Sequence, residues 1–199
     1  MKELKKVEEL LVVVDMVNGF IREGNMKDSY IEHIIPGIKE LVKDYVELDN
    51  KEVFYIRERH SENASEFKKF PRHCVENTSE SEVVDELKLY EDSVRTYFKN
   101  CTCAIFAKGL LEDIKKMDNL NRVTVTGCCS DICVLNFVLG LINFFDEYNM
   151  DIKVEVREDL IETYDAPNHN RNEYNEMARK LLVQAGAKLT RGESRNYGR

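Results

Sequence analysis

Short apolar, β-branched runs alternate along this chain with segments of helical periodicity, and that alternation constrains the fold more than any other feature. Residues 10–14 form a continuous apolar run, which is typical of a strand buried on both faces. Residues 31–46 then place apolar side chains at the spacing of one helix face. The same reasoning predicts further strands at residues 53–56, 94–98, 123–126 and 152–156, and helices at residues 110–117, 132–145 and 173–184. Leu189 begins a last short strand.

Strands that alternate with helices pair in parallel through right-handed crossovers. We therefore predict an α/β fold, a three-layer α/β/α sandwich with a mostly parallel central sheet. A length of 199 residues suits one domain, and the sequence shows neither an internal repeat nor an interdomain linker. The prediction is a single domain over residues 1–199 with a frayed polar tail at residues 191–199.

Composition and charge argue against several classes of function. A formal net charge of −8, with the basic residues scattered, works against binding to nucleic acid. No apolar run approaches the roughly 18 residues that a membrane span needs, and the first residues lack the apolar core of a signal peptide. We expect a cytoplasmic protein whose six cysteines are reduced thiols and whose partner is a small molecule.

Chemically useful side chains follow directly on the predicted strands. Asp15 ends the first strand, Glu58 the second and Lys99 the third, and a cysteine-rich turn that contains Cys133 follows the fourth. In open parallel sheets, ligands bind beyond the carboxyl ends of the strands. We therefore expect these side chains to face one crevice.

Cys133 is the candidate nucleophile of that crevice. It is expected at the first turn of an apolar helix, where backbone N–H groups and the helix dipole favour a thiolate. Asp15 would supply a base and Lys99 a cation, so the three groups together suit covalent attack on an amide. Taken singly, each has an ordinary alternative explanation: a core thiol, a helix N-cap and a solvated lysine.

A polar loop after the second strand, about residues 58–78, is a candidate metal site. Glu58 and His60 lie on the same side of an extended segment because strand side chains alternate with a period of two. Glu66 and His73 follow in the same loop. Two imidazoles and two carboxylates suit one divalent transition metal, Zn, Mn or Fe. A solvated polar face is the alternative explanation.

Three segments at these strand ends form motifs. Residues 15–20 read D-M-V-N-G-F, residues 99–104 read K-N-C-T-C-A, and residues 127–134 read G-C-C-S-D-I-C-V. They are similar to D-x-x-N-D-F, K-x-x-x-[SC]-A and G-x-x-x-D-x-C-V of the isochorismatase-like cysteine hydrolases. From Leu11 to about Leu189, the chain resembles this family and, within it, the nicotinamidases.

The resemblance implies a mechanism and a role for each residue. Asp15 would take the proton of Cys133 and later return it to departing ammonia, while Lys99 would hold Asp15 and lower the pKa of the thiol. A cis peptide precedes the nucleophile in this family, at the position of Cys128 and Cys129 here. It would orient the backbone N–H groups of Cys129 and Cys133 as an oxyanion hole.

The resemblance to nicotinamidases also extends to the polar loop. Residues 70–75 read F-P-R-H-C-V, which looks like their W-P-P-H-C-V, and the metal there binds the pyridine nitrogen of nicotinamide. Glu58, His60, Glu66 and His73 match the ligands, and zinc is the metal we expect first. The chain departs from the pattern in Glu58 for Asp, Gly19 for Asp and Phe70 for Trp.

Aromatic side chains complete the predicted pocket. Phe20, Phe70 and Phe106 are the candidate walls against which a substrate ring would stack. Ordinary core packing is the alternative for each of them. Two other histidines are interpreted as structural: His33 lies in the first helical segment, and His169 lies in a loop before the last helix that could approach a neighbouring subunit.

The resulting hypothesis is an amidohydrolase that converts nicotinamide to nicotinate and ammonia through a cysteine thioester. One alternative is a related hydrolase that acts on another small amide, carbamoyl or ureido compound, and metal content would distinguish the two. A second alternative is a non-catalytic binding module of the same fold, and a thiol redox role is weaker because no Cys-x-x-Cys occurs. Homo-oligomers are also compatible with this sequence.

Overall fold

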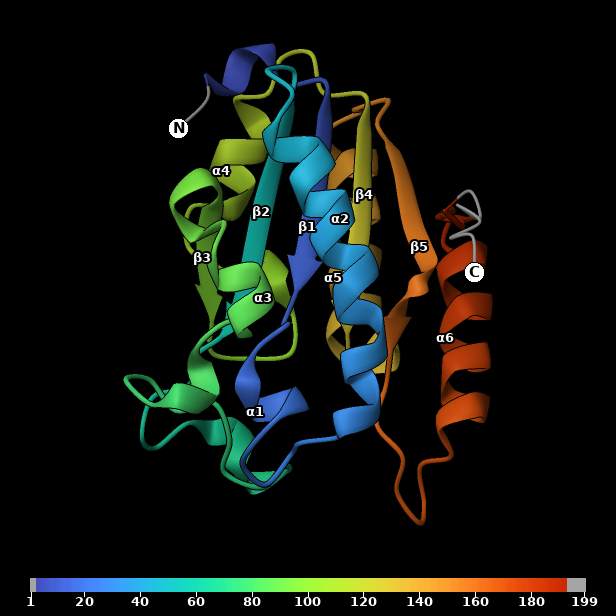
Figure 1. Cartoon of the computed structure of the whole chain (residues 1–199). Helices are drawn as coiled ribbons and strands as arrows, with labels where there is room; N and C mark the ends of the chain where they lie inside the picture. Colours follow the sequence, from blue (N-terminus) through green and yellow to red (C-terminus); the bar gives the residue numbers. More distant parts are fainter. Residues whose placement is uncertain (1–2, 193–199) are drawn as a thin grey trace, which may run out of the picture.

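The computed structural model describes residues 3–192, and its centre is a six-stranded sheet (Figure 1). The strands are β1 (Glu9–Val14), β2 (Lys51–Glu58), β3 (Arg95–Lys99), β4 (Arg122–Cys128), β5 (Lys153–Glu162) and β6 (Lys188–Thr190). Their order is β3-β2-β1-β4-β5-β6, and every neighbouring pair is parallel. The carboxyl ends of all six strands therefore point to the same edge of the sheet, where ligands bind in such folds.

Helices cover both faces of the sheet, so the predicted three-layer α/β/α sandwich is confirmed (Figure 1). The α-helices are α1 (Asn18–Ile21), α2 (Ile35–Val46), α3 (Asp85–Lys88), α4 (Leu110–Lys115), α5 (Leu135–Glu147) and α6 (Arg171–Gln184). Short 3₁₀ helices are η1 (Leu4–Lys6), η2 (Ser29–Ile34), η3 (Ser65–Lys68), η4 (Ser79–Ser81), η5 (Glu91–Ser93) and η6 (Ala104–Phe106), and η7 (Ser130–Val134) is a π-helical turn. Within residues 3–192, no helix has the length and apolar character needed to cross a bilayer.

The central strand β1 explains why both faces need helices. Leu10, Val12 and Val14 belong to the core cluster that contains α4, α5 and the buried side of α6. Leu11 and Val13 belong to the opposite cluster, which contains α1, α2 and α3. None of these five side chains is more than 2% exposed, so the continuous apolar run is a strand buried on both faces, as predicted.

Two predicted helices begin differently in the structure. The segment predicted as a helix from residue 31 starts as the 3₁₀ helix η2 and continues as α2, whose first turn contains Pro36. Proline suits the first turn of a helix because its missing N–H would have no partner there. The helix predicted from residue 132 becomes a regular α-helix only at Leu135, because residues 130–134 form the π-helical turn η7. Such turns are frequent at functional sites.

β5 is longer than the sequence predicted. It extends from Lys153 to Glu162 rather than over residues 152–156, and its pairing with β4 shifts register after Val156. The charged segment that hides this continuation contains Arg157, which pairs with Asp159 at 2.7 Å. Beyond the irregularity, Ile161 is buried and pairs with Gly127 of β4. The strand therefore reaches the ligand edge of the sheet.

Candidate active site

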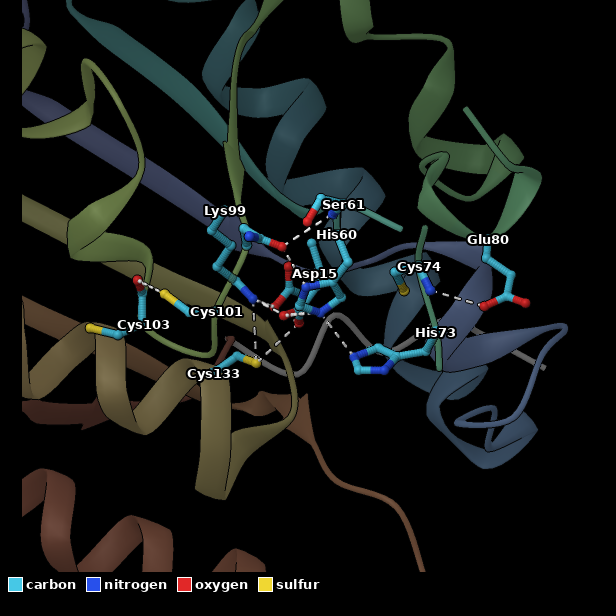
Figure 2. A network of polar contacts seen from close by, with 12 residues as sticks. Asp15, His60, Ser61, His73, Cys74, Glu80, Lys99, Cys101, Cys103 and Cys133 are labelled. Atoms are coloured by element: carbon cyan, nitrogen blue, oxygen red, sulfur yellow. Dashed lines mark hydrogen bonds and ion pairs between the residues drawn. The ribbon is translucent and has the colours of Figure 1, made fainter. Parts of the chain in front are cut away.

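Asp15, Lys99 and Cys133 meet at the ligand edge of the sheet (Figure 2). Asp15 follows the last residue of β1, Lys99 is the last residue of β3, and Cys133 lies in η7 directly after β4. Lys99 Nζ lies 2.8 Å from Asp15 Oδ2 and 3.6 Å from Cys133 Sγ. All three side chains are buried. The structure thus brings together the three residues that the strand ends had selected.

The backbone of Asp15 adopts a conformation that non-glycine residues seldom use. Its φ angle is +51°, in the left-handed region. Its N–H donates to Ile56 O at 2.9 Å, and its carbonyl accepts from Val17 N at 2.8 Å and from Cys128 Sγ at 3.2 Å. The surrounding strands hold this turn, and such conformations cluster at functional sites.

Burial and neighbouring charges set the protonation of this group. Burial raises the pKa of Asp15 to about 6, with Lys99 opposing the shift and the Glu58 carboxylate adding to it. Burial works against the charge of Lys99, but Asp15, Cys133 and Glu58 outweigh it and hold the pKa of Lys99 well above its usual value. Asp15 can therefore exchange a proton near neutral pH while Lys99 stays charged.

The surroundings of the Cys133 thiol disfavour its ionisation, which agrees with a mechanism in which Asp15 takes its proton. Burial raises the pKa of Cys133 well above its usual value, and the carboxylates of Asp15 and Glu58 add to this effect. Lys99 lowers the pKa of the thiol, as expected, but does not outweigh burial. A base is needed to form the thiolate, and the Asp15 carboxylate lies within 4.8 Å of Cys133 Sγ.

The turn before Cys133 has the backbone that the family resemblance implied. The peptide bond between Cys128 and Cys129 is cis. Gly127 has a φ angle of +112°, and a Cβ there would lie only 2.0 Å from Val14 O, so glycine is required. Cys129 O accepts from Val134 N at 3.1 Å, which folds the turn back on itself. Cys129 and Cys133 line the same pocket, and their oxyanion role remains a prediction.

Four side chains of the polar loop gather beside Lys99. Glu58 ends β2, His60 follows two residues later, Glu66 lies in η3, and His73 lies in the loop beyond it. One ligand atom from each lies within 4.8 Å of the other three. Glu58, His60 and His73 are buried, and Glu66 is partly exposed. This donor set suits a divalent transition metal.

Hydrogen bonds orient both histidines for metal binding. His60 Nδ1 lies 2.9 Å from Asn100 Oδ1, and His73 Nδ1 lies 2.7 Å from Pro71 O, so each Nδ1 carries the proton that it donates. The Nε2 atoms, which keep their lone pairs, face each other at 3.3 Å. That distance matches the roughly 3.3–3.4 Å edge of a tetrahedron whose metal–nitrogen bonds measure about 2.0–2.1 Å.

A buried oxygen completes the case that these residues fit a metal ion. Glu58 Oε1 lies 3.0 Å from His60 Nε2, and the two pair only while that nitrogen carries a proton. With Nε2 unprotonated, two nitrogen lone pairs and a carboxylate oxygen converge, and a metal ion satisfies all three. The cluster of Glu58, His60, Glu66 and His73 therefore has the chemistry of a divalent-metal site.

A pocket opens beside the metal cluster and the Asp15, Lys99 and Cys133 side chains. Cys133, Glu58, Glu66 and His73 contribute to its walls. Phe20 and Phe70 also line it, with ring centroids 5.4 Å and 6.5 Å from that of His73. Met26, Thr102, Ile132 and Tyr164 complete the walls. The aromatic and apolar walls suit a small flat ring, and the polar groups of the pocket lie at the metal cluster and at the thiol.

Phe106 is not part of this pocket, and that prediction is wrong. Its side chain is 79% exposed, because η6 turns Ala104 into the core and Phe106 toward solvent. Tyr164 is a wall that sequence reasoning missed. It lies two residues beyond the end of β5, so the strand-end rule would have selected it had the full length of β5 been visible.

The fold and the site together define a class of protein: a parallel α/β sandwich with the residue layout of a cysteine hydrolase at its carboxyl edge. Residues 9–194 match the family model of the isochorismatase domain. The chain belongs to the isochorismatase family.

Similar proteins share this fold. Nicotinamidase 1 of Arabidopsis thaliana is 29% identical over 142 residues, which cover 64% of this chain and 57% of that relative. The match thus spans little more than half the length of the plant protein. N-carbamoylsarcosine amidase from Thermoplasma acidophilum superposes with a TM-score of 0.77 at 20% identity, covering 96% of this chain and 99% of the other. Pyrazinamidase of Pyrococcus horikoshii in complex with zinc superposes with a TM-score of 0.75 at 24% identity, covering 93% and 99%.

Proposed function

We propose that this protein is an amidohydrolase that converts nicotinamide to nicotinate and ammonia through a Cys133 thioester. The observation that carries the proposal is Lys99 Nζ, buried 2.8 Å from Asp15 Oδ2 and 3.6 Å from Cys133 Sγ in a pocket that also contains the metal cluster. The plant relative's name, a nicotinamidase, supports the choice of substrate.

The first half of the reaction forms the thioester. The Asp15 carboxylate accepts the thiol proton, and Cys133 Sγ attacks the carboxamide carbon of the substrate. The C–N bond then breaks, and the Asp15 carboxyl group returns its proton to the departing ammonia. Lys99 keeps Asp15 in place and offsets the negative charge that develops at the sulfur.

The second half releases nicotinate. Asp15, again a carboxylate, accepts a proton from the water that attacks the thioester carbon, and Cys133 leaves and recovers its proton. The negative oxygen in both halves would accept hydrogen bonds from the backbone N–H groups of Cys129 and Cys133. The Cys129 N–H suits this role because it donates to no other acceptor within residues 3–192.

Glu58, His60, Glu66 and His73 would hold one divalent metal, for which zinc is our first choice. Bound there, the ion would act as a Lewis acid toward the pyridine nitrogen and so orient the ring. Phe20 and Phe70 would stack against that ring and exclude water. This donor set also separates the proposal from its rival, a hydrolase for another small amide or carbamoyl compound, which would not need a ligand for a ring nitrogen.

The proposal extends to the setting of the protein. We propose a cytoplasmic location, which agrees with six cysteines that are all free thiols in the structure. Assembly into homo-oligomers stays a prediction.

The test is ammonia release from nicotinamide by the wild type, Cys133→Ala and Cys103→Ala. Cys103 is the matched control, because its thiol is partly exposed and lies outside the pocket. We expect activity in the wild type and in Cys103→Ala and none in Cys133→Ala, with thermal unfolding curves that show all three folded. An active Cys133→Ala would disprove the nucleophile. A wild type that releases ammonia from carbamoyl compounds but not from nicotinamide, and that purifies without metal, would favour the rival.

A further inference from the structure

A tight turn carries His169 from the end of β5 into the interior. Ala166 N donates to His169 O at 3.0 Å, and His169 N donates to Ala166 O at 2.9 Å. Pro167 and Asn168 occupy the centre of this turn, as such residues commonly do. Asn170 then caps α6 by accepting from Glu173 N at 3.1 Å. The turn leaves His169 only 7% exposed, although it lies in a loop.

The His169 ring is stacked between two tyrosines. Its centroid lies 3.9 Å from that of Tyr164 with an interplanar angle of 8°, and 3.7 Å from that of Tyr174 with an angle of 26°. Tyr164 lines the pocket next to Cys133, whereas Tyr174 belongs to α6. The stack therefore supports one wall of the pocket from behind.

Both ring nitrogens of His169 face hydrogen-bond acceptors. Nε2 lies 2.8 Å from Asp131 Oδ2, and Nδ1 lies 3.0 Å from Tyr164 O. The ring is therefore held at both of its nitrogens, between a carboxylate of the nucleophile turn and a carbonyl of the segment after β5. Asp131 is held as well by Thr163 Oγ1, which donates to its other oxygen at 2.5 Å.

The side chains around the ring come from η7, from the loop after β5 and from α6. Asp131 comes from η7 and is the one carboxylate in hydrogen-bond contact with His169 within residues 3–192. Arg171, the nearest cation along the chain, is turned away and pairs with Asp28. The two tyrosines, from the loop after β5 and from α6, contribute ring faces. The Asp131 and His169 side chains are 10% and 9% exposed, so solvent screens the pair weakly.

Asp131 lies two residues before Cys133 in the same turn, and Tyr164 is a wall of the pocket. We propose that His169 is a positioning residue: through Asp131 and Tyr164, its ring joins the nucleophile turn to the pocket wall. Its effect on turnover rests on the proposed function. Its effect on the reactivity of Cys133 does not.

Two substitutions separate the polar link from the stack. His169→Phe keeps a ring between the tyrosines but removes both ring nitrogens. Asp131 then loses its contact with residue 169, while Tyr164 keeps its stacking contact. We expect kcat for nicotinamide to fall about 10-fold or more with KM nearly unchanged, because the lost bond involves a charged acceptor. His169→Ala removes the stack too, so KM should rise in addition. The control His33→Phe, whose ring also contacts a tyrosine but is half exposed and lies outside the pocket, should change neither constant.

One measurement needs no substrate and decides the inference even if nicotinamide is not hydrolysed. The rate of Cys133 alkylation by iodoacetamide, read from its peptide by mass spectrometry, should change by a similar factor in Asp131→Asn and in His169→Phe. The double variant should show no further change, because the two residues act as one unit. A Cys133 rate that neither substitution alters, or that the double variant changes further, would overturn the inference.

Discussion

Glu58 Oε2 lies 2.8 Å from Lys99 Nζ, so a residue of the metal cluster is also bonded to the lysine of the catalytic group. Its other oxygen, Oε1, lies 3.0 Å from His60 Nε2. Burial alone would raise the pKa of Glu58, but Lys99 and His60 outweigh it and lower that pKa to about 2. The carboxylate is therefore charged at any pH at which the enzyme works. It contacts both the metal cluster and the lysine that holds Asp15.

Replacing Glu58 should affect both metal binding and the group around Lys99, whereas replacing Asn100 should affect metal binding alone. Glu58→Gln removes a metal ligand and one of the two carboxylates paired with Lys99. Asn100→Ala removes the oxygen that orients His60 and that also accepts from Ser61 N, but it takes no carboxylate from Lys99. Zinc affinity should fall by about 10-fold or more in both, since loss of an outer partner alone costs about 10–100-fold. At saturating zinc, kcat should recover in Asn100→Ala but not in Glu58→Gln.

The measurements are zinc competition with a chelating dye and steady-state ammonia release over a zinc series. Full recovery of kcat in Glu58→Gln at saturating zinc would show that its contact with Lys99 has no catalytic consequence.

The pH dependence of the reaction should follow the ionisation of Asp15. A base must be unprotonated to accept the Cys133 proton, and burial raises the pKa of Asp15 to about 6. Below that pH the carboxyl group is protonated and cannot act, so kcat/KM should rise with pH through about 6 and then level. Lys99 causes no second change of kcat/KM near neutral pH, because its pKa lies well above its usual value. A kcat/KM profile that is flat between about pH 5 and pH 7 would contradict Asp15 as the base.

Gly19, where the family pattern has aspartate, is required by its neighbours. A Cβ at this position would lie 2.6 Å from Cys74 Sγ and 3.1 Å from Glu80 O. Gly19→Ala should therefore lower the free energy of unfolding by about 1–3 kcal/mol, a typical cost of overpacking. In a Cys74→Ala background the sulfur is gone, so the same substitution should cost less. Urea unfolding of the two single variants and the double variant measures this, and equal costs in both backgrounds would contradict the steric explanation.

Strand ends were the part of the site that sequence could predict. Asp15, Lys99 and Cys133 each follow a short apolar run, and parallel pairing necessarily brings the ends of such runs to one edge. The four metal-cluster residues were accessible for a similar reason, because Glu58 ends β2 and the others share one loop. Local patterning selected these candidates, and the family resemblance was needed to prefer a metal site over a solvated polar face.

Contacts between distant segments were not accessible in this way. Charged residues interrupt β5, so its true end and the nearby wall Tyr164 escaped the pattern. The bond between His169 and Asp131 joins residues 38 positions apart, and nothing in the composition of either segment predicts it. The extent of burial around Cys133 was not visible either: burial raises the pKa of the thiol, and Asp15 and Glu58 add to that effect.

Two of the three phenylalanines predicted as pocket walls give a matched comparison. Phe70 lines the pocket and lies against His73, whereas Phe106 is 79% exposed on η6. Phe70→Ala should raise KM for nicotinamide by about 3- to 10-fold, because an aromatic pair contributes about 0.5–1.5 kcal/mol. Phe106→Ala should leave KM and kcat nearly unchanged.

Neither substitution should unfold the protein, because neither side chain is buried in the core clusters. Steady-state ammonia release with thermal unfolding as a check on folding measures both variants. Equal increases of KM in Phe70→Ala and Phe106→Ala would mean that substrate lies nearer to η6 than to His73, and the pocket assigned to the ring would then be wrong.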